Sequence, residues 1–486
     1  MKTLADLLPG AALSADLALT PIAAVTADSR NVQRGSAFFA IPGHKGDGLD
    51  FVADAAARGA VVVVAQRTAE CALPFVVVPD VRAALAHAAA RMFPGQPQTV
   101  AAVTGTSGKT SVVAFLRQIW TALGHEAASL GTVGVVAKKD TLYGSLTTPG
   151  PVELHRNLAL LADQRVTHLA MEASSLGIEQ RRLDGVRLAA GAFTNFSRDH
   201  LDHHADMEAY FQAKMRLFDP MLAPGQPAVV DADGDYADRV IDLCRKRGLD
   251  VLTVGARGEA IRIVEARPHA LATSLRLSCR NVEYVVELPL AGAFQTSNAL
   301  VAAGLALATG GEPSKIFSAL AGLHGAPGRL ELAGQKSGAP VFIDYAHKPD
   351  ALDKVLDTLR PLAKGKLVVV FGCGGDRDKG KRPLMGEIAA RKADVAIVTD
   401  DNPRSEQAPD IRAAILEGAR SAGGGAQIHE IGDRRAAIRA GVAMLAQGDI
   451  LVVAGKGHET GQIVGAETLP FSDHEAVAAA LKDEPT

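Results

Sequence analysis

The stretch that most constrains the fold is an apolar run at residues 100–103 that leads into Thr-Gly-Thr-Ser-Gly-Lys-Thr at 104–110. The apolar run predicts a buried strand, and the segment from 111 to about 123 predicts a helix. A strand, a glycine loop and a Lys-Thr pair at a helix start form a phosphate cradle. Backbone N–H groups and the helix terminus attract phosphate oxygens, Lys109 adds a cation, and the Thr110 hydroxyl can bind Mg²⁺. We therefore expect an α/β domain that binds a nucleotide.

The spacing of the glycines departs from the usual P-loop. Four residues normally separate the two glycines, which would put the first at 103, but that position is Val103 and the glycine is Gly105. The shortened loop argues against ordinary GTPases and motor ATPases. The alternative is a glycine-rich turn that binds nothing, and the Gly-Lys-Thr placed directly after a buried strand argues against that alternative.

Length and composition narrow the class of protein. The 486 residues allow two to four domains, and a net charge of −3 without a basic stripe argues against a nucleic-acid partner. The four cysteines lie far apart and form no C-x-x-C pair, which argues against a zinc site and a disulfide framework. Asp6 interrupts the N-terminal apolar stretch, which argues against a signal peptide. No apolar run reaches 18 residues, which argues against a membrane span. We expect a cytoplasmic, monomeric enzyme without membrane insertion.

Residues 1–97 predict a small α/β unit. Val-rich runs at 61–65 and 75–78 indicate buried strands, and the Pro-Gly-Gln-Pro sequence at 94–97 indicates a linker. A glycine-rich loop at 43–48 carries His, Lys and Asp, which suits contact with an anionic ligand. Taken alone, these residues favour a solvated turn.

Residues 98–328 predict the nucleotide-binding unit. A strand at 168–172 ends in Glu172, and ligands of open α/β sheets bind at the carboxyl ends of strands, so Glu172 is either a metal ligand or a solvated strand end. A strand at 189–195 runs into a cluster of histidines and aspartates at 199–204, where magnesium on phosphate is more natural than zinc. A helix over 207–218 carries Lys214, and a lone helix lysine is normally solvated.

Two further segments complete the predicted architecture. Alternating residues over 261–290 predict a β-meander at the edge of the central unit. Residues 329–486 predict a doubly wound, Rossmann-like unit with strands at 341–344, 367–371, 395–399 and 450–454, each followed by a polar cluster. Four polar clusters at one end of a sheet predict a ligand-binding face. The predicted fold is α/β with three domains, 1–97, 98–328 and 329–486.

Seven motifs occur in an order that resembles one family. They are Gly-Thr-Ser-Gly-Lys-Thr, Met-Glu-Ala-Ser-Ser, Asn-Phe-Ser-Arg-Asp-His-Leu-Asp, Asp-Tyr-Ala-His, Phe-Gly-Cys-Gly-Gly-Asp-Arg-Asp-Lys-Gly-Lys-Arg-Pro, Asp-Asn-Pro-Arg and Ala-Gly-Lys-Gly-His-Glu. Over essentially its whole length the chain resembles the Mur ligases of peptidoglycan synthesis, which support cell-wall growth, cell shape and cell division. It is most similar to members that add the third stem-peptide residue to UDP-N-acetylmuramoyl-L-alanyl-D-glutamate. The resemblance implies an ATP-dependent amide ligase that works through an acyl phosphate.

The resemblance also implies a nucleotide and metal site. Lys109 would contact the β- and γ-phosphates, and Lys214 matches the lysine that such ligases carbamylate. Glu172 and His200 complete the implied catalytic residues. The implied Mg²⁺ ligands are Thr110, Glu172, His200 and carbamylated Lys214. The implied ATP-binding residues are Gly105, Thr106, Ser107, Gly108, Lys109, Thr110, Ser111, Asn298, Arg329, Asp344 and His347.

The remaining implied residues bind the other two substrates. The family often has Asn where this chain has Leu146, so only a backbone contact could survive there. The implied UDP-sugar-peptide residues are Ala27, Ser29, His44, Lys45, Gly46, Leu146, Thr147, Thr148, Ser174, Gln180 and Arg182. The implied amino-acid residues are Arg377, Asp401, Asn402, Pro403, Arg404, Gly455 and Glu459.

The added amino acid is inferred from Arg404. Its guanidinium can make a bidentate pair with the distal carboxylate of meso-2,6-diaminopimelate, a carboxylate that lysine lacks. Glu459 would face an ammonium group. Three alternatives stay open: an L-lysine-adding Mur ligase, a folylpolyglutamate synthase, and a binding protein that uses ATP as a switch. The synthase should lack the Asp-Asn-Pro-Arg motif and the N-terminal unit, and the binding protein would bind ATP without releasing ADP.

Overall fold

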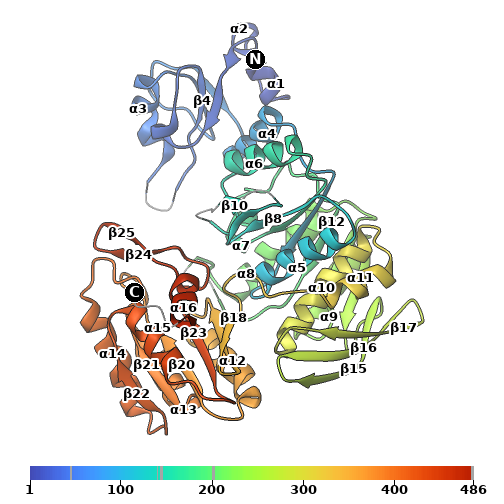
Figure 1. Cartoon of the computed structure of the whole chain (residues 1–486). Coiled ribbons are helices and arrows are strands. Elements are labelled where there is room, and N and C mark those ends of the chain that lie inside the picture. Colours follow the sequence, from blue (N-terminus) through green and yellow to red (C-terminus); the bar gives the residue numbers. More distant parts are fainter. Residues whose placement is uncertain (44–45, 139–140, 143–145, 200–202, 483–486) are drawn as a thin grey trace. The chain divides into compact units, whose positions relative to one another are not determined.

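Parallel β-sheets covered by helices make up most of the chain (Figure 1). The computed structural model describes residues 1–43, 46–138, 141–142, 146–199 and 203–482. The chain divides into two units. Unit 1 comprises Met1–Arg262 with Leu300–Ile316, and unit 2 comprises Ile263–Ala299 with Phe317–Thr486. Both units have the predicted α/β fold.

The first part of unit 1 contains a four-stranded parallel sheet in the order β3-β4-β5-β6. Both predicted Val-rich strands are present, and their alternate residues feed the two apolar clusters on opposite faces of the sheet. Helix α4 packs against α6 of the next part. The elements are β1 Lys2–Thr3, α1 Leu4–Leu7, α2 Ala15–Ala18, β2 Pro21–Ile22, β3 Ala24–Thr26, β4 Ser36–Phe39, α3 Val52–Ala57, β5 Ala60–Ala65, β6 Phe75–Val77 and α4 Val81–Met92.

The second part of unit 1 is built around a larger sheet in the order β10-β9-β8-β11-β7-β12-β13-β14. Strand β7 lies between β11 and β12, and both neighbours run parallel to it. Its elements are β7 Thr99–Thr104, α5 Lys109–Ala122, β8 Ala127–Gly131, β9 Gly134–Val136, β10 Thr141–Leu142, α6 Pro151–Asp163, β11 His168–Glu172, α7 Ser175–Glu179, β12 Ala190–Phe193, α8 Met207–Met215, β13 Pro227–Asp231, α9 Ala237–Lys246 and β14 Asp250–Gly255.

The register of these strands brings three loops to one edge. Val103 of β7 pairs with Glu172 of β11, and Thr104 pairs with Phe193 of β12. Because parallel strands end at the same edge, the loops after β7, β11 and β12 start side by side. The strands predicted at 100–103, 168–172 and 189–195 are therefore confirmed, and with them the shared edge.

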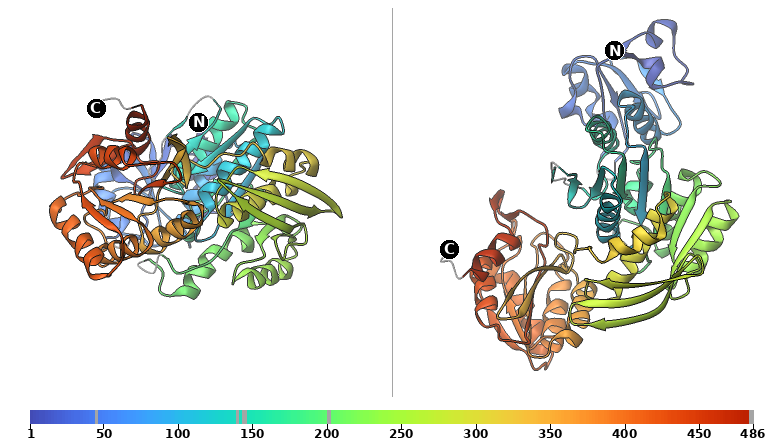
Figure 2. Two further views of the ribbon diagram at one scale, coloured as in Figure 1. Left: turned by 60° about the horizontal axis from the view of Figure 1, so that its bottom comes forward. Right: turned by 45° about the vertical axis from the view of Figure 1, so that its right-hand side comes forward.

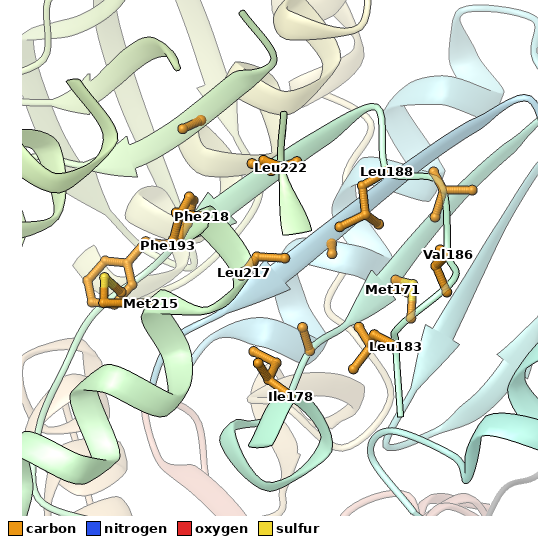
Figure 3. Packing of buried hydrophobic residues seen from close by; sticks show 14 of the residues in the cluster. Met171, Ile178, Leu183, Val186, Leu188, Phe193, Met215, Leu217, Phe218 and Leu222 are labelled. Atoms are coloured by element: carbon orange, nitrogen blue, oxygen red, sulfur yellow. The ribbon is translucent and has the colours of Figure 1, made fainter. Parts of the chain in front are cut away.

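Helix α8 is shorter than the helix predicted over 207–218. It ends at Met215, and a wider helical turn, Leu217–Met221, follows. The apolar core explains this change. Leu217 and Phe218 are fully buried and pack with Phe193 and Leu222, as Figure 3 shows. The core therefore fixes the end of the helix that carries Lys214.

Unit 2 contains the predicted meander and a doubly wound sheet. In the order β18-β19-β23-β20-β21-β22, every pair except β18–β19 is parallel. The elements are β15 Ile261–His269 (shared with unit 1), β16 Ala272–Cys279, β17 Val282–Leu288, α10 Ala293–Ala308 (shared with unit 1), α11 Pro313–Leu320 (shared with unit 1), β18 Glu331–Lys336, β19 Ala339–Asp344, α12 Pro349–Leu359, β20 Leu367–Phe371, α13 Lys381–Lys392, β21 Val395–Val398, α14 Ala408–Ser421, β22 Gln427–Glu430, α15 Arg434–Ala443, β23 Ile450–Ala454, β24 Gly461–Val464, β25 Glu467–Pro470 and α16 Asp473–Leu481.

Alternating residues explain why helices cover both faces of this sheet (Figure 2). Val369 and Phe371 of β20 share a cluster with α12, α13 and α14, whereas Val368 and Val370 share a cluster with α15 and α16. A strand buried on both faces is apolar throughout, as Leu367–Phe371 is. Among the described residues, no helix has the length and hydropathy to cross a membrane.

Candidate functional site

The loop after β7 is held by the neighbouring strand end. The Asn195 side chain accepts from the Ser107 N–H at 3.0 Å and donates to the Ser107 carbonyl at 3.1 Å. Thr194 also donates to the Ser107 carbonyl, at 2.7 Å. Gly105 has a φ of +143°, and a Cβ there would overlap the Thr194 hydroxyl, so only glycine fits. Helix α5 starts at Lys109, which leaves its first N–H groups at the loop.

Two lysines converge on one carbonyl of this loop. Lys109 Nζ and Lys214 Nζ donate to the Gly105 carbonyl at 2.9 and 2.8 Å. Lys214 also lies over the Tyr210 ring, 4.3 Å from its centre. Burial, together with repulsion from Lys109, lowers the pKa of Lys214 well below its usual value. The shift favours the neutral amine, and Lys214 is buried rather than solvated as a lone helix lysine usually is.

Glu172 is buried at the end of β11, where the sequence predicts it. Its Oε1 accepts from the Thr132 N–H at 2.8 Å, and its Oε2 accepts from the Thr132 hydroxyl at 3.2 Å. Thr132 also contacts the Thr147 hydroxyl at 3.0 Å. Glu172 and Thr110 are both buried, and a carboxylate and a hydroxyl supply hard oxygens, which suit Mg²⁺ rather than zinc.

The structure describes only part of the histidine and aspartate cluster at 199–204. His200 and Asp202 lie outside the described residues. His204 is buried, and its ring bonds the Ser175 hydroxyl at 3.1 Å. Within the described parts of the chain, no group of three or more His, Cys, Asp or Glu side chains is arranged to hold a metal ion.

Five of the residues expected to bind the peptide arm form one network. Arg182 donates to the Gln180 side chain at 2.8 Å and to the Thr148 carbonyl at 2.7 Å. The Thr148 hydroxyl bonds Ser174 at 3.1 Å and the Glu172 carbonyl at 3.0 Å, and Thr147 joins through Thr132. Burial lowers the pKa of Arg182.

The structure describes four further predicted UDP-sugar residues, and none of these four has a hydrogen bond to this network. Leu146 and Ala27 are exposed, Ser29 is buried, and Gly46 accepts from the Gly43 N–H at 2.9 Å. His44 and Lys45 lie outside the described residues.

In unit 2, Asp344 is held by backbone groups. Its two oxygens accept from the Leu330 and Ala346 N–H groups at 2.6 and 2.7 Å, and burial raises its pKa to about 6. Burial lowers the pKa of His347 to about 4. Its Nδ1 donates to the Tyr345 carbonyl at 2.8 Å, so the neutral ring presents Nε2 as an acceptor.

Two further residues of the predicted adenosine site lie in unit 2. The Arg329 guanidinium lies over the Tyr345 ring, 4.8 Å from its centre. The buried Asn298 donates to Gln295 at 3.4 Å.

The loop at 401–404 packs against the glycine-rich loop after β20. Arg404 Nη1 donates to the Gly375 carbonyl at 2.9 Å, and neither Nε nor Nη2 has a partner among the described residues. A Cβ at Gly375 would overlap the Pro403 carbonyl. The glycines of this segment therefore serve close packing, and part of the Arg404 fork stays available to a ligand. Arg377, in the same segment, is exposed and donates to its neighbour's carbonyl.

The end of β23 reaches the same loop. Gly455 is buried and lies against the Asp401 carboxylate, which a Cβ would meet at 2.7 Å. Glu459 accepts from the Asn402 amide at 2.9 Å. The structure thus brings together Asp401, Asn402, Pro403, Arg404, Gly455 and Glu459.

Sequence analysis missed several residues that hold these groups. Asn195 and Thr132 lie in loops of unit 1, and Lys456 is buried between Asn402 and Glu459 in unit 2. Asn195 is the last residue of the strand predicted at 189–195, and a polar residue at a strand end was a usable signal. Nothing local in the sequence indicates the contacts of Thr132 or Lys456.

Comparisons with known proteins agree with this architecture. Three family models match: "Mur ligase family, catalytic domain" at residues 21–93, "Mur ligase middle domain" at 103–306, and "Mur ligase, glutamate ligase domain" at 328–457. A UDP-N-acetylmuramoyl-L-alanyl-D-glutamate--2,6-diaminopimelate ligase of Bradyrhizobium diazoefficiens is 56% identical, with 97% of each chain covered.

Solved structures give the same result. A structure with the same ligase name has a TM-score of 0.72 and 32% identity and covers 99% of both chains. The Mycobacterium tuberculosis folylpolyglutamate synthase complexed with ADP and AMPPCP has a TM-score of 0.60 and 18% identity, covering 80% of this chain and 92% of its own. At that identity, the synthase shows a shared fold alone.

The contact at Gly375 predicts a stability effect. Gly375→Ala forces the two loops apart, and overpacking of this kind costs about 1–3 kcal/mol. We expect the thermal midpoint of the full chain to fall by about 2–10 °C. The matched control is Gly425→Ala, because a Cβ there meets no atom within 4 Å. Equal midpoints for the two variants would contradict the close packing.

Proposed function

The chain belongs to the Mur ligase family, and from that premise we propose that it joins meso-2,6-diaminopimelate to UDP-N-acetylmuramoyl-L-alanyl-D-glutamate with hydrolysis of ATP to ADP and phosphate. The name of the relative that is 56% identical supports this substrate. The observation that carries the proposal is the Arg404 fork, held on one side by the Gly375 carbonyl and open on the other. We place the reaction in the cytoplasm. We propose that the enzyme is a monomer with domains at 1–97, 98–328 and 329–486.

The ATP phosphates are assigned to the loop at 105–111. Its N–H groups at the start of α5 and the Lys109 ammonium neutralise charge on the transferred phosphoryl group. Thr110, Glu172, His200 and Lys214 would hold Mg²⁺, which would stabilise negative charge on the phosphates. Asn298, Arg329, Asp344 and His347 are assigned to the adenosine part, where the neutral His347 ring offers an acceptor nitrogen.

Lys214 is proposed to carry a carbamate. Only a neutral amine attacks CO₂, and the lowered pKa of the buried Lys214 favours that form. The reaction forms an N–C bond and releases one proton. It converts the amine into an anion with two oxygens, which the neighbouring Lys109 ammonium attracts.

The reaction needs a good leaving group on the substrate carboxylate. A γ-carboxylate oxygen of the D-glutamyl residue attacks the γ-phosphorus of ATP, which gives an acyl phosphate and ADP. The amine of diaminopimelate then attacks the acyl carbon, phosphate leaves, and an amide forms. The network of Thr147, Thr148, Ser174, Gln180 and Arg182 would orient the peptide arm in the first step.

An isotope experiment tests the acyl phosphate. With ¹⁸O in the γ-carboxylate of the peptide substrate, one labelled oxygen should leave in the released phosphate, as mass spectrometry of that phosphate would reveal. Phosphate without the label would exclude this intermediate, because no other step carries the carboxylate oxygen to phosphorus.

The substrate is tested by ADP release with ATP, Mg²⁺ and the UDP-linked dipeptide, with diaminopimelate or L-lysine in parallel. We expect turnover with diaminopimelate, and Arg404→Ala should raise its KM by roughly 100-fold because two charge-assisted bonds are lost. Arg420→Ala, an exposed arginine on α14, is the control and should leave this KM unchanged.

Other outcomes of this assay separate the alternatives. Equal or better turnover with L-lysine would keep the ligase and overturn the Arg404 assignment. Turnover with a folate and glutamate would favour the folylpolyglutamate synthase. ATP binding without ADP release would favour the binding protein.

The carbamate predicts a dependence on CO₂. Protein depleted of CO₂ at about pH 6 should lose activity, and bicarbonate should restore it, because low pH protonates and releases carbamates. Lys214→Met should lower kcat/KM by roughly 100-fold without recovery in bicarbonate. The exposed Lys246 provides the control, and Lys246→Met should behave as the wild type. Full activity of Lys214→Met would refute the role.

A further inference from the structure

One buried lysine of unit 2 has no role in the reaction described above. Lys456 follows β23 and is fully buried, with none of its side chain exposed. Its Nζ donates to Asn402 Oδ1 at 2.9 Å and to Glu459 Oε2 at 2.8 Å. Burial of an ammonium costs free energy, and this lysine recovers it through one carboxylate and one amide that both belong to the proposed amino-acid site.

Together with one further bond, these contacts join the side chains of Lys456, Asn402 and Glu459 in a triangle. Asn402 Nδ2 donates to the same Glu459 oxygen, Oε2, at 2.9 Å. Asn402 Oδ1 accepts a second bond from the Ile463 N–H, also at 2.9 Å. Because Oδ1 faces two donors and Nδ2 faces an acceptor, only one orientation of the Asn402 amide satisfies all its partners.

The triangle leaves one atom of Glu459 for a ligand. Both bonds to its carboxylate end on Oε2, and Oε1 has no partner among the described residues. The Glu459 side chain is about one third exposed (31%), so the free oxygen can reach a bound molecule. Without Lys456, the carboxylate would keep only the Asn402 bond and could rotate.

The end of the strand before Lys456 is anchored by a buried side chain, which fixes the backbone from which Lys456 extends. Arg434 donates to the Ala454 carbonyl at 3.0 Å and makes a fully buried pair with Asp473 at 2.7 Å. The other side of the triangle is tied to β24, because Gln462 donates to the Asp401 carbonyl at 2.7 Å.

We propose that Lys456 is a positioning residue for the amino-acid substrate. It holds Glu459 through Oε2 and fixes the Asn402 amide, so that Oε1 of Glu459 meets an ammonium group of the incoming amino acid. The inference rests on the proposed function, since it concerns the same site. Lys456 touches no substrate itself and acts through Glu459.

The first test is Lys456→Met, which keeps the length of the side chain and removes the ammonium. We expect the KM for diaminopimelate to rise roughly 10- to 100-fold, with the KM for ATP and for the UDP-linked dipeptide within about 2-fold of the wild type. Lys392→Met is the matched control, because Lys392 pairs with Asp353 and Asp357 at the surface of the same unit. An unchanged amino-acid KM in Lys456→Met would overturn the proposal.

A double-mutant cycle separates positioning from a general effect on folding. Glu459→Gln keeps the shape of the side chain and removes its charge. If Lys456 acts through Glu459, adding Lys456→Met to Glu459→Gln should change the KM less than about 3-fold. Independent, multiplying effects would overturn the proposal. If Lys456→Met fails to fold, Lys456→Gln enters the same cycle, because its amide can still donate to one partner.

The same assay distinguishes a failure of the proposed function. A wild-type chain that turns over L-lysine instead would overturn the proposed substrate, and the cycle would then be measured on the KM for lysine, which also carries ammonium groups. A wild-type chain that accepts neither amino acid would overturn both proposals.

Discussion

Parallel pairing of β7 with β11 and β12 is the constraint on which the proposed nucleotide site depends. Because Val103 pairs with Glu172 and Thr104 pairs with Phe193, the loops after β7, β11 and β12 start at the same edge of the sheet. A shift of one residue in either pair would turn each side chain to the opposite face of the sheet. Because of this backbone register, the amide of Asn195 reaches Ser107 in the loop after β7. The carboxylate of Glu172 lies at the end of β11 and bonds Thr132.

Electrostatics at the Gly105 carbonyl explains why a lysine can be buried there. Two amines share one acceptor, so they cannot both carry a proton at low cost. Burial and repulsion from Lys109 lower the pKa of Lys214, which favours its neutral form. Packing enforces the arrangement, since Met215, Leu217 and Phe218 anchor the helix end in the core (Figure 3).

Much of the fold could be predicted from the sequence, because buried parallel strands are continuous apolar runs, as at 100–103 and 367–371. Polar residues just after such runs predicted a ligand-binding edge in both sheets. The end of α8 could not be predicted, since the packing of Leu217 and Phe218 depends on strand β12. The roles of Thr132 and Lys456 could not be predicted for a related reason. Thr132 bonds Glu172, forty residues away, Lys456 bonds the distant Asn402, and lysine is seldom buried. The resemblance supplied residue roles that no local pattern indicates.

Arg404 adopts a left-handed backbone conformation, with a φ of +52°, and hydrogen bonds to Ile463 and Gly465 hold it there. The backbone conformation of Arg404 is thus held by a hairpin about sixty positions later in the chain. If Arg404 selects the amino acid as proposed, a change of that selection would involve both segments. Grafting the four-residue motif alone into a related scaffold would transfer the sequence without the hairpin that holds the Arg404 backbone. A graft that includes the hairpin would transfer both.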